Sequence, residues 1–495
     1  MLTDAQTAFL KGIQGKRAAI VGIGVTNVPL IRFLAGHGVQ VTACDQKQED
    51  SLASELRSLA GLDVQYLLGP GYLDALPGFD AVYLSPGVNP GRPEIEAARR
   101  AGAAVSSEID LVLRLSSAPT IGITGSSGKT TTTTLTGLIL REDARRHHPA
   151  RQVLVGGNIG APVIERVLTV GPDDLIVLEL SSFQLKLLEV SPNVAAVLNV
   201  TPNHLDVHPS MDDYVWSKEN IVRYQSDDDW AVLGADNDIT QLMAERAPGR
   251  IMFFSASRSV PRGAFLDNDR LVMRWRAGAG SGRSAGSGGS GVGDTVVARR
   301  SDLKIPGLHN VQNALAAIAV CAAVGADPEA MRDAIASFSG VEHRLEPAGE
   351  IGGVIFINDS IATTPSRTIA ALLAMERPTV LIAGGYDKHL PFDEMAQLAL
   401  GKVHTVSLVG VTADKIQRAF EEAAERAGAE PPAIIREDTF REAVEAARLA
   451  SRPGDVVLLS PACASYGLFR NFEERGRTFK QLVSEFAADA GKAGE

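Results

Sequence analysis

The sequence predicts an α/β protein with three domains. The chain has 495 residues, which at roughly 150 residues per domain corresponds to about three domains. Short apolar segments, rich in β-branched residues, alternate with helix-length segments along most of the chain. Hydrophobic residues make up 45% and charged residues 22% of the sequence. Both values are close to globular averages, which excludes a mostly disordered chain.

The first domain is predicted over residues 1–117. Residues 16–25 read KRAAIVGIGV, an apolar run that ends in glycines. Residues 28–35 predict a helix, and residues 39–43 predict a second strand that ends near Asp45. Another strand is expected over 80–84 and another helix over 94–101. A β-α-β unit with an acidic residue after its second strand is typical of a Rossmann-like domain.

The second domain is predicted over residues 118–340, with Pro119 at its boundary. Strands are expected over 120–124, 175–180 and 194–200, with a helix that runs to Arg141. Residues 277–293 are almost entirely Gly, Ser and Ala. Because strand-like sequence continues on both sides, we interpret this segment as a flexible surface insertion rather than a linker between domains.

The third domain is predicted over residues 341–495. Strands over 354–357, 379–383, 405–409 and 456–459 alternate with helices such as the one over 414–427. This alternation predicts a second Rossmann-like domain at the C-terminus.

Composition excludes several classes of protein. The net charge of -11 disfavours a nucleic-acid-binding role. The three cysteines, Cys44, Cys321 and Cys463, are far apart, which argues against a disulfide framework or a structural zinc site. No apolar run is long enough to cross a membrane, and residues 1–12 do not resemble a signal peptide. We therefore expect a cytoplasmic protein with neither a nucleic-acid nor a membrane partner.

The strongest motif is a glycine loop between a strand and a helix. It consists of Gly125, Ser126, Ser127, Gly128, Lys129 and Thr130, followed by Thr131. Glycines let backbone N–H groups point at phosphate oxygens, a lysine reaches the β and γ phosphates, and a hydroxyl can bind Mg²⁺. Ile123 stands where the general GxxxxGK pattern has its first glycine. The strand–loop–helix context nevertheless favours a P-loop-type mononucleotide-binding domain over a glycine turn with a solvated lysine.

A second glycine turn, Gly22-Ile-Gly24, is a weaker signal. A dinucleotide fingerprint would have a third glycine where Asn27 stands, so NAD binding is disfavoured. Two interpretations remain open for this turn. It either holds another diphosphate at a helix N-terminus or is a tight strand-to-helix turn without a ligand.

Two further candidate residues follow predicted strands of the second domain. Glu179 ends one strand, where a carboxylate would face the ligand crevice and could hold Mg²⁺. His204 follows the next strand as a possible metal ligand. Taken alone, Glu179 is more often a surface or capping acid, and a lone loop histidine is more often only hydrogen-bonded.

Taken together, the motifs of the chain resemble those of the Mur ligases, and within them the glutamate-adding branch. The resemblance covers essentially the whole chain, in order, and departs mainly at the Gly/Ser insertion. The motifs that carry it are GITGSSGKTTTT, GGNIG (156–160), ELSSFQL (179–185), NVTPNHLDVH (199–208), HNVQNALAA (309–317), HRLE (343–346), NDSIATTP (358–365), GGYDK (384–388) and LSPACASYGLFRNFEERG (459–476).

The resemblance implies an ADP-forming, ATP-dependent acid–amino-acid ligase of peptidoglycan precursor synthesis, and so a role in cell-wall biogenesis, cell shape and division. It implies UDP-N-acetylmuramoyl-L-alanine and D-glutamate as substrates, two Mg²⁺ ions, an acyl-phosphate intermediate and a monomeric enzyme. The N-terminal domain would bind the UDP group, the central domain ATP, and the C-terminal domain the amino acid. Anionic carboxylate and phosphate must meet in such a reaction, so cations have to neutralise their repulsion.

The resemblance also assigns roles to individual residues. Lys129, Glu179, His204 and Lys218 would be catalytic, and Thr130, Glu179, His204 and a carbamylated Lys218 would hold the metal ions. From the sequence alone Lys218 is an ordinary lysine on a polar helix face. Further ATP contacts would come from Asn310, Asn313, Arg344 and Asp359. The UDP substrate would contact Thr26, Asp45, Gly87 and Asn158, and glutamate would contact Thr363, Lys388, Ser465 and Phe472.

One departure and several alternatives stay open. Many relatives read DSKAT where this chain has Asp359-Ser-Ile361-Ala-Thr363, and isoleucine cannot carry the charge of that lysine. The choice between D- and L-glutamate is therefore open. Another Mur-type ligase or a folylpolyglutamate-type ligase is the nearest alternative. An oxidoreductase that uses the N-terminal glycine turn and a non-catalytic nucleotide-binding regulator belong to other classes.

Overall fold

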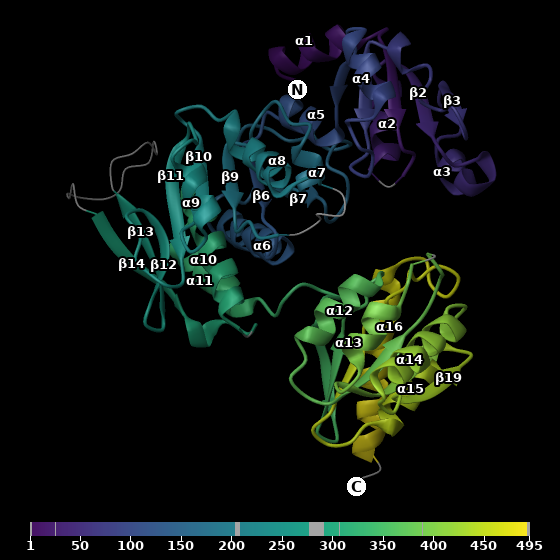
Figure 1. The fold of residues 1–495 in the computed structure, drawn as a ribbon. Helices are drawn as coiled ribbons and strands as arrows, with labels where there is room; N and C mark the ends of the chain where they lie inside the picture. The colour runs from purple at the N-terminus through teal and green to yellow at the C-terminus, as the bar shows by residue number, and fades with distance from the viewer. Residues whose placement is uncertain are drawn as a thin grey trace. The chain divides into compact units, whose positions relative to one another are not determined.

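The computed structural model describes residues 2–24, 26–202, 208–276, 292–305, 307–388 and 390–492. The chain forms two compact units, residues 1–338 and 339–495, each of which is described by itself. Three sheets, two in the first unit and one in the second, are covered by helices (Figure 1). The predicted α/β class with three domains is confirmed.

The first sheet has five parallel strands in the order β3-β2-β1-β4-β5, the doubly wound arrangement expected of a Rossmann-like domain. Its strands are β1 (Arg17–Val21), β2 (Gln40–Asp45), β3 (Val64–Leu68), β4 (Ala81–Leu84) and β5 (Ala104–Ser106). The helices of this region are α1 (Asp4–Ile13), α2 (Asn27–Gly36), α3 (Ala53–Ser58), α4 (Pro93–Arg100) and α5 (Glu108–Leu115).

The second sheet has nine strands in the order β14-β13-β12-β11-β10-β9-β6-β8-β7, and only β13 and β14 join it by antiparallel pairing. Its strands are β6 (Thr120–Thr124), β7 (Val153–Gly157), β8 (Leu175–Glu179), β9 (Val194–Val197), β10 (Trp230–Gly234), β11 (Arg250–Ser255), β12 (Gly263–Asp267), β13 (Arg270–Arg276) and β14 (Val292–Arg299). The helices are α6 (Lys129–His147), α7 (Ser182–Leu185), α8 (Met211–Arg223), α9 (Asp238–Ala244), α10 (Leu308–Ala323) and α11 (Pro328–Ser337).

The third sheet has six strands in the order β15-β16-β20-β17-β18-β19, and only the edge strand β15 is antiparallel. Its strands are β15 (Glu346–Ile351), β16 (Val354–Asn358), β17 (Thr379–Ala383), β18 (Val403–Val409), β19 (Ala433–Glu437) and β20 (Val456–Leu459). The helices are α12 (Pro365–Leu373), α13 (Asp393–Ala399), α14 (Ala413–Ala427), α15 (Phe440–Ala450) and α16 (Phe472–Lys492).

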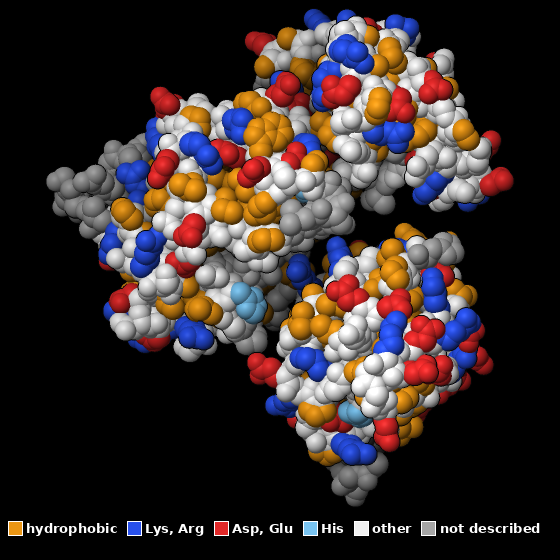
Figure 2. Space-filling view, viewed as in Figure 1, with side chains coloured by type: hydrophobic (Ala, Val, Ile, Leu, Met, Phe, Trp, Pro, Cys, Tyr) orange, Lys and Arg blue, Asp and Glu red, His pale blue; other side chains and the backbone are white. Residues whose placement is uncertain are grey.

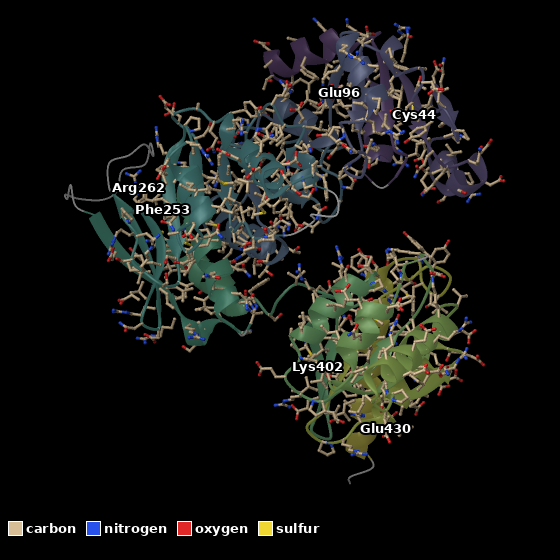
Figure 3. The ribbon with its side chains drawn as sticks, viewed as in Figure 1. Cys44, Glu96, Phe253, Arg262, Lys402 and Glu430 are labelled. Carbon is tan, nitrogen blue, oxygen red and sulfur yellow. The ribbon has the colours of Figure 1, made fainter. Side chains whose placement is uncertain are left out.

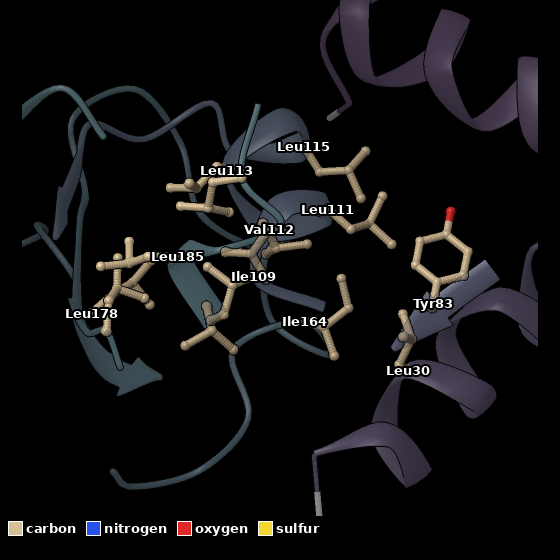
Figure 4. Packing of buried hydrophobic residues seen from close by; sticks show 14 of the residues in the cluster. Leu30, Tyr83, Ile109, Leu111, Val112, Leu113, Leu115, Ile164, Leu178 and Leu185 are labelled. Atoms are coloured by element: carbon tan, nitrogen blue, oxygen red, sulfur yellow. The ribbon is translucent and has the colours of Figure 1, made fainter. Parts of the chain in front are cut away.

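The two sheets of the first unit share a hydrophobic core around α5. Leu30 and Tyr83 from the first sheet region, Leu111 from α5, and Ile164 and Leu178 from the second sheet region belong to one buried cluster (Figure 4). α5 can serve both sides because most of its residues are buried, with its cap supplied by the Ser107 side chain. Helix α5 therefore joins the two sheets by packing and not only by chain connection.

Most central strands of the three sheets agree with the sequence-based prediction, but the fully buried β10 in the middle of the second sheet was not predicted. The observed strands β1, β4, β6, β8, β9, β16, β17, β18 and β20 fall on the predicted segments, and α14 falls within one residue of its predicted start. The strands flanking the Gly/Ser segment are β13 and β14, as expected, and residues 277–291 between them lie outside the described part of the chain. Edge strands such as β3, β5 and β19 were not predicted, because they are short and partly exposed.

Further expectations from composition can be compared with the structure. All three cysteines are free and buried, and Cys44 lies in the first sheet (Figure 3). Acidic and basic side chains are interspersed over the face shown in Figure 2, without a continuous basic surface. Across the described residues, no helix has both the length and the apolar character that a bilayer crossing requires.

Gly122, in the middle of β6, lets a helix approach this strand closely. A Cβ atom at Gly122 would lie 2.6 Å from Pro192 Cγ, 3.0 Å from Leu180 Cδ1 and 3.2 Å from Ile221 Cδ1. Ile221 and Lys218 are three residues apart on α8 and so share a face of that helix. The missing side chain at Gly122 therefore helps to bring Lys218 to the end of β6.

Replacing Gly122 with alanine should push α8 away from β6. We expect Gly122→Ala to lower the free energy of unfolding by about 1–3 kcal/mol, the usual cost of overpacking a core. Chemical denaturation of the full-length protein would measure the change.

Gly36→Ala is the matched control for this substitution. Gly36 ends α2 and is exposed, and a Cβ atom added there would meet no other atom within 4 Å. Alanine there should leave stability unchanged or raise it by up to about 1 kcal/mol, because alanine favours helix more than glycine does. Equal destabilisation by both substitutions would contradict the packing argument.

Candidate active site

The glycine loop predicted from the sequence connects β6 to α6. Because β6 pairs in parallel with β8 on one side and β9 on the other, their carboxyl ends meet at this loop. Asn199, which follows β9, holds the loop in place. Its backbone carbonyl accepts from Ser126 N at 2.9 Å, and its side-chain Oδ1 accepts from Ser127 N at 3.0 Å.

The start of α6 presents donors at the end of this loop. Gly128 precedes the helix in a left-handed conformation with φ 83°, which favours glycine. The N–H groups of the first helical turn have no partner within an α-helix and can bind phosphate oxygens. Lys129 Nζ donates to Gly125 O at 2.9 Å, so its charge lies over the loop itself.

Asn310 and Asn313 from α10 lie beside this loop. Asn313 Nδ2 donates to Asn310 Oδ1 at 3.1 Å, which confirms that the two amides share a helix face. Asn313 Oδ1 accepts from Thr132 Oγ1 at 3.4 Å and would collide with a side chain at Gly128. The structure therefore brings these two asparagines to the phosphate loop.

Glu179 ends β8 and is almost fully buried, at 1% exposure. Asn158 Nδ2 donates to Glu179 Oε1 at 2.9 Å, while Oε2 is buried without a hydrogen-bond partner among the described residues. A buried carboxylate oxygen without a partner costs free energy unless a ligand satisfies it. Glu179 is thus not the surface or capping acid that the sequence left open.

Lys218 is buried, with 1% exposure, rather than lying on a polar helix face. Its Nζ donates to Gly125 O at 3.0 Å and to Thr124 Oγ1 at 3.3 Å, and it lies 4.8 Å from the centre of the Tyr214 ring. Burial, and then the charge of Lys129, lowers the pKa of Lys218 well below its ordinary value. At a given pH, the neutral amine form is therefore more populated at Lys218 than at a surface lysine.

These side chains fit a magnesium ion. The orphaned Oε2 of Glu179 is a hard anionic ligand of the kind that Mg²⁺ prefers, and the Thr130 hydroxyl belongs to the adjacent helix start. Among the described residues, no three His, Cys, Asp or Glu side chains converge into a cluster of their own. His204, the remaining predicted ligand, lies outside the described residues.

The N-terminal glycine turn is held by Asp45 and Asn27. Asp45 Oδ2 accepts from Ile23 N at 2.7 Å, and Asn27 Nδ2 donates to Gly22 O at 2.9 Å. This hydrogen bond is a structural reason for asparagine at position 27, where a dinucleotide fingerprint would have its third glycine. Thr26 precedes α2 without a side-chain capping bond, and a side chain at Gly87 would meet no atom within 4 Å. Asp45 therefore stabilises the glycine turn that precedes Thr26.

In the second unit, Asp359 follows β16 and lies next to Arg344. Leu345 N donates to Asp359 Oδ1 at 3.2 Å, and Ser460 Oγ donates to Oδ2 at 2.8 Å. Burial raises the pKa of Asp359 to about 6, although both hydrogen bonds and the charge of Arg344 lower it. His343 and Leu345, on either side of Arg344, have positive φ values of 64° and 44°, which are rare outside glycine. Asp359 thus fixes the backbone that carries Arg344.

Arg475 connects two loops of this unit. It is buried at 2% exposure, and its guanidinium donates to Ser360 O at 2.9 Å, to Ser360 Oγ at 3.0 Å and to Cys463 O at 3.1 Å. All of these acceptors are neutral, so burial lowers the pKa of Arg475 to about 10. The loops after β16 and β20 are therefore held together by one cation.

The four predicted glutamate contacts lie on loops at the carboxyl edge of β16, β20 and β17 or at the start of α16. Tyr386 N donates to Ala464 O at 2.9 Å, which joins the loop of Lys388 to that of Ser465. Phe472 O accepts from Ser360 Oγ at 2.8 Å, and Thr363 follows on the same loop as Ser360. Burial, followed by the charges of Arg367 and Arg475, lowers the pKa of Lys388. These residues belong to one edge of the third sheet.

Comparison with protein families covers all three sheets. Residues 16–107 match the MurD-like N-terminal domain of Mur ligases, residues 123–321 the Mur ligase middle domain, and residues 343–463 the Mur ligase glutamate ligase domain. The UDP-N-acetylmuramoylalanine–D-glutamate ligase of Symbiobacterium thermophilum is 49% identical over 94% of this chain and 98% of its own length. The chain belongs to the Mur ligase family.

Other members of the family agree with this assignment. Ligases with the same name from Acetivibrio thermocellus and Clostridium novyi are 44% and 42% identical over 97% and 96% of this chain and 98% of their own lengths. Among solved structures, the UDP-N-acetylmuramate-alanine ligase MurC of Thermotoga maritima covers 95% of this chain and 99% of its own, with 20% identity and a TM-score of 0.53. At this identity, the likeness shows the fold alone.

Several residues that shape the carboxyl edges of the second and third sheets were not predicted from the sequence. Asn199 lies within a motif but was not singled out, and Tyr214, whose OH lies 3.0 Å from Ser126 Oγ, was not predicted. Arg475 and Ser460 were also missed. The available signal was position, since Asn199 and Ser460 lie within two residues of the carboxyl ends of β9 and β20. Position alone could not show that the Arg475 side chain is buried and hydrogen-bonds the loops after β16 and β20.

Removing the Asn199 side chain should loosen the phosphate loop of this Mur ligase. We expect Asn199→Ala to raise the KM for ATP about tenfold, because the loop amide of Ser127 loses a partner worth about 1 kcal/mol or more. Steady-state kinetics with varied ATP would measure the change.

Asn193→Ala is the matched control. Asn193 precedes β9, and its Oδ1 accepts from Thr120 N, at the start of β6, at 3.0 Å. This bond lies at the opposite end of β6 and β9 from Asn199. This substitution should lower stability without changing the KM for ATP. Equal kinetic effects of the two substitutions would refute a specific role of Asn199.

The raised pKa of Asp359 predicts a pH-dependent stability. The folded protein holds the proton more tightly than the unfolded chain, so this group stabilises the fold below about pH 4 and loses that effect as pH rises to about 6. Asp359→Asn should remove a slope worth on the order of 3 kcal/mol over this window. Denaturation of both proteins at several pH values would give the difference, and parallel stability curves would contradict the prediction.

Proposed function

We propose that this chain is an ATP-dependent ligase that joins D-glutamate to the carboxylate of UDP-N-acetylmuramoyl-L-alanine, with ADP and phosphate as the other products. The observation that carries the proposal is that relatives 42–49% identical over nearly the full chain are all ligases of this name. The glycine loop at the start of α6 supports the proposal, because a loop of this kind before a helix can bind the phosphates of a nucleotide.

The first unit would bind ATP and the UDP substrate. Residues 125–131 would cradle the phosphates, with backbone N–H groups at the start of α6 as donors. Asn310 and Asn313 would contact the nucleoside beside this loop. Thr26, Asp45 and Gly87 at the N-terminal turn, together with Asn158, would hold the UDP substrate.

The chemical step needs positive charge between two anions. A substrate carboxylate must attack the γ-phosphate, and Lys129 at the loop would offset their repulsion. Mg²⁺ would supply further charge neutralisation when bound by Thr130, Glu179, His204 and Lys218. The amine of the amino acid would then attack the acyl phosphate, and phosphate would leave from a tetrahedral intermediate.

Carbamylation of Lys218 is part of the proposal. An ammonium group would repel a magnesium ion, whereas a carbamate offers anionic oxygens. A carbamate forms from a neutral amine and carbon dioxide, and burial lowers the pKa of Lys218 toward that neutral form. The position of Lys218 against Gly125 would put such a group next to the phosphate loop.

The second unit would bind the amino acid through Thr363, Lys388, Ser465 and Phe472. A dicarboxylic amino acid requires cations, and Lys388 is one of several near the carboxyl edge of the third sheet. Arg344 and Asp359, which the structure places together, would contact the phosphate and ribose of ATP. The protein would act in the cytoplasm as a monomer.

Phosphate release from Mg-ATP tests the proposed function. With UDP-N-acetylmuramoyl-L-alanine present, we expect release that depends on D-glutamate and not on L-glutamate, and mass spectrometry should find the amide product. Dependence on L-glutamate would overturn the stereochemistry, and absence of release with either would overturn the proposed substrates.

Lys129→Ala tests the role of the loop. The variant should remain folded but lose at least about 100-fold in kcat, because removing a preorganised charge from a transferring phosphoryl group costs several kcal/mol. Lys11→Ala on the exposed face of α1 is the control and should retain full activity. Unimpaired turnover of Lys129→Ala would exclude the assigned role.

A further inference from the structure

Ser182, His208 and Asp213 form a chain of hydrogen bonds that the proposed mechanism does not use. Ser182 Oγ lies 2.9 Å from His208 Nε2, and His208 Nδ1 lies 2.6 Å from Asp213 Oδ2. Ser182 and His208 are buried, at 2% and 3% exposure. Ser182 begins α7, Asp213 lies in the first turn of α8, and His208 precedes α8. The chain therefore connects three segments inside the first unit.

The chemistry of the three groups fixes the direction of these bonds. A carboxylate accepts hydrogen bonds and cannot donate them, so the proton between Asp213 and His208 lies on Nδ1. In the neutral imidazole, Nε2 then accepts from the Ser182 hydroxyl. Lys186 Nζ donates to both oxygens of Asp213, at 2.7 and 2.9 Å. Burial acts to raise the pKa of Asp213, but the hydrogen bonds from Lys186 and His208 lower it below its ordinary value.

The arrangement resembles that of serine hydrolases, but Ser182 is not placed to act as a nucleophile. A catalytic serine has to reach its substrate, and Ser182 is buried. The Phe183 ring stacks on the His208 ring with 5.1 Å between their centres, and the Tyr214 ring meets it edge-on at 5.1 Å. The enclosed imidazole is therefore suited to holding chain segments together.

These hydrogen bonds tie α7 to α8, which lie side by side (Figure 1). Ser182 begins α7 three residues after Glu179, and Lys186 caps the other end of α7. Asp213 lies five residues before Lys218 on α8. Two connections, one direct and one through the imidazole, meet at Asp213. The segment that follows Glu179 is therefore held to the helix that carries Lys218.

The same connection reaches the phosphate loop through Tyr214. This residue directly follows Asp213, and its ring packs against His208. Tyr214 OH lies 3.0 Å from Ser126 Oγ, and Lys218 Nζ lies 4.8 Å from the centre of the Tyr214 ring. A displacement of His208 would therefore affect the phosphate loop and Lys218 as well as α7.

We propose that His208 is a positioning residue that fixes Glu179 and Lys218 relative to each other by joining Ser182 to Asp213. The inference rests on the proposed function, in which Glu179 and Lys218 hold Mg²⁺. This ion requires a near-octahedral set of ligands, so ligands on separate segments must be held close to their required positions. His208 acts through those segments and is not itself a catalytic residue.

The competing explanation is that the buried hydrogen bonds only stabilise the fold. In that case their loss would lower the free energy of unfolding but leave metal binding and turnover by the folded protein unchanged. Loss of a positioning residue would instead weaken metal binding in a protein that remains folded. Metal affinity, measured apart from catalysis, therefore separates the two explanations.

The test measures binding of Mn²⁺, a spectroscopic substitute for Mg²⁺, in the presence of ADP. Electron paramagnetic resonance of the full-length protein gives the dissociation constant without turnover. We expect His208→Ala to raise this constant about 10-fold and to lower kcat about 10- to 100-fold, because supporting partners of metal ligands have effects of this size. The KM for D-glutamate should stay unchanged, since its proposed contacts lie in the second unit.

Ser182→Ala is a milder variant, which decides the question if His208→Ala does not fold. It removes one hydroxyl and should also weaken Mn²⁺ binding. The double substitution should bind Mn²⁺ no more weakly than His208→Ala alone, because both changes interrupt the same connection. Losses that multiply would show that the two residues act independently and would overturn the inference.

Ser407→Ala is the matched control. Ser407 is fully buried on β18 in the second unit, and its Oγ donates to Ala443 O at 2.9 Å. The same hydroxyl is removed from a comparable environment, so the loss of stability should be similar. Mn²⁺ binding and kcat should not change. A general effect of destabilisation would appear in both serine variants and would overturn the assignment of His208.

The outcomes distinguish this inference from the proposed function. If the unsubstituted protein shows no turnover that depends on D-glutamate, the proposed function has failed, and Mn²⁺ binding still decides the role of His208. If the unsubstituted protein binds no Mn²⁺ with ADP, or if His208→Ala and Ser182→Ala bind it equally tightly, the inference is refuted. Weaker binding in both variants, with Ser407→Ala unchanged, supports it.

Discussion

β6 pairs in parallel with β8 on one side and β9 on the other, and the positions of the phosphate loop, Glu179 and Asn199 follow from that register. Parallel strands end at a common edge, so the loop after β6, Glu179 at the end of β8 and Asn199 after β9 must be neighbours. The hydrogen bonds from Ser126 and Ser127 to Asn199 are a local result of this pairing. Without this parallel pairing, Lys129 and Glu179 would not lie at the same edge of the sheet.

Both units accept a cost in burying charge near their candidate sites. Lys218 is buried against a backbone carbonyl and a hydroxyl, and Arg475 against neutral oxygens. Replacement of such groups by apolar ones is often neutral or favourable for stability. The retention of Arg475 fits a protein whose ligands are anions, because positive charge in a region of low dielectric attracts an anion more strongly than the same charge in water.

The sequence was informative where local chemistry decides the structure. Central strands are apolar on both faces, so β6, β9, β17 and β20 could be located, and the glycine loop has a distinctive local sequence. Edge strands such as β3 and β19 lack that signal. The burial of Lys218 could not be predicted, because it depends on Gly122 allowing α8 close to β6. The link from Arg475 to Ser360 spans 115 residues and has no local signature.

That link has a consequence for how substitutions combine. One guanidinium holds both the loop of Ser360 and the loop of Cys463. The free energy that stabilises either loop therefore depends on the conformation of the other. Changes in the two loops should interact rather than add, as they do among residues that share one hydrogen-bond network. The amino acids permitted in one loop therefore depend on those present in the other, and the two segments are free to vary only as a pair.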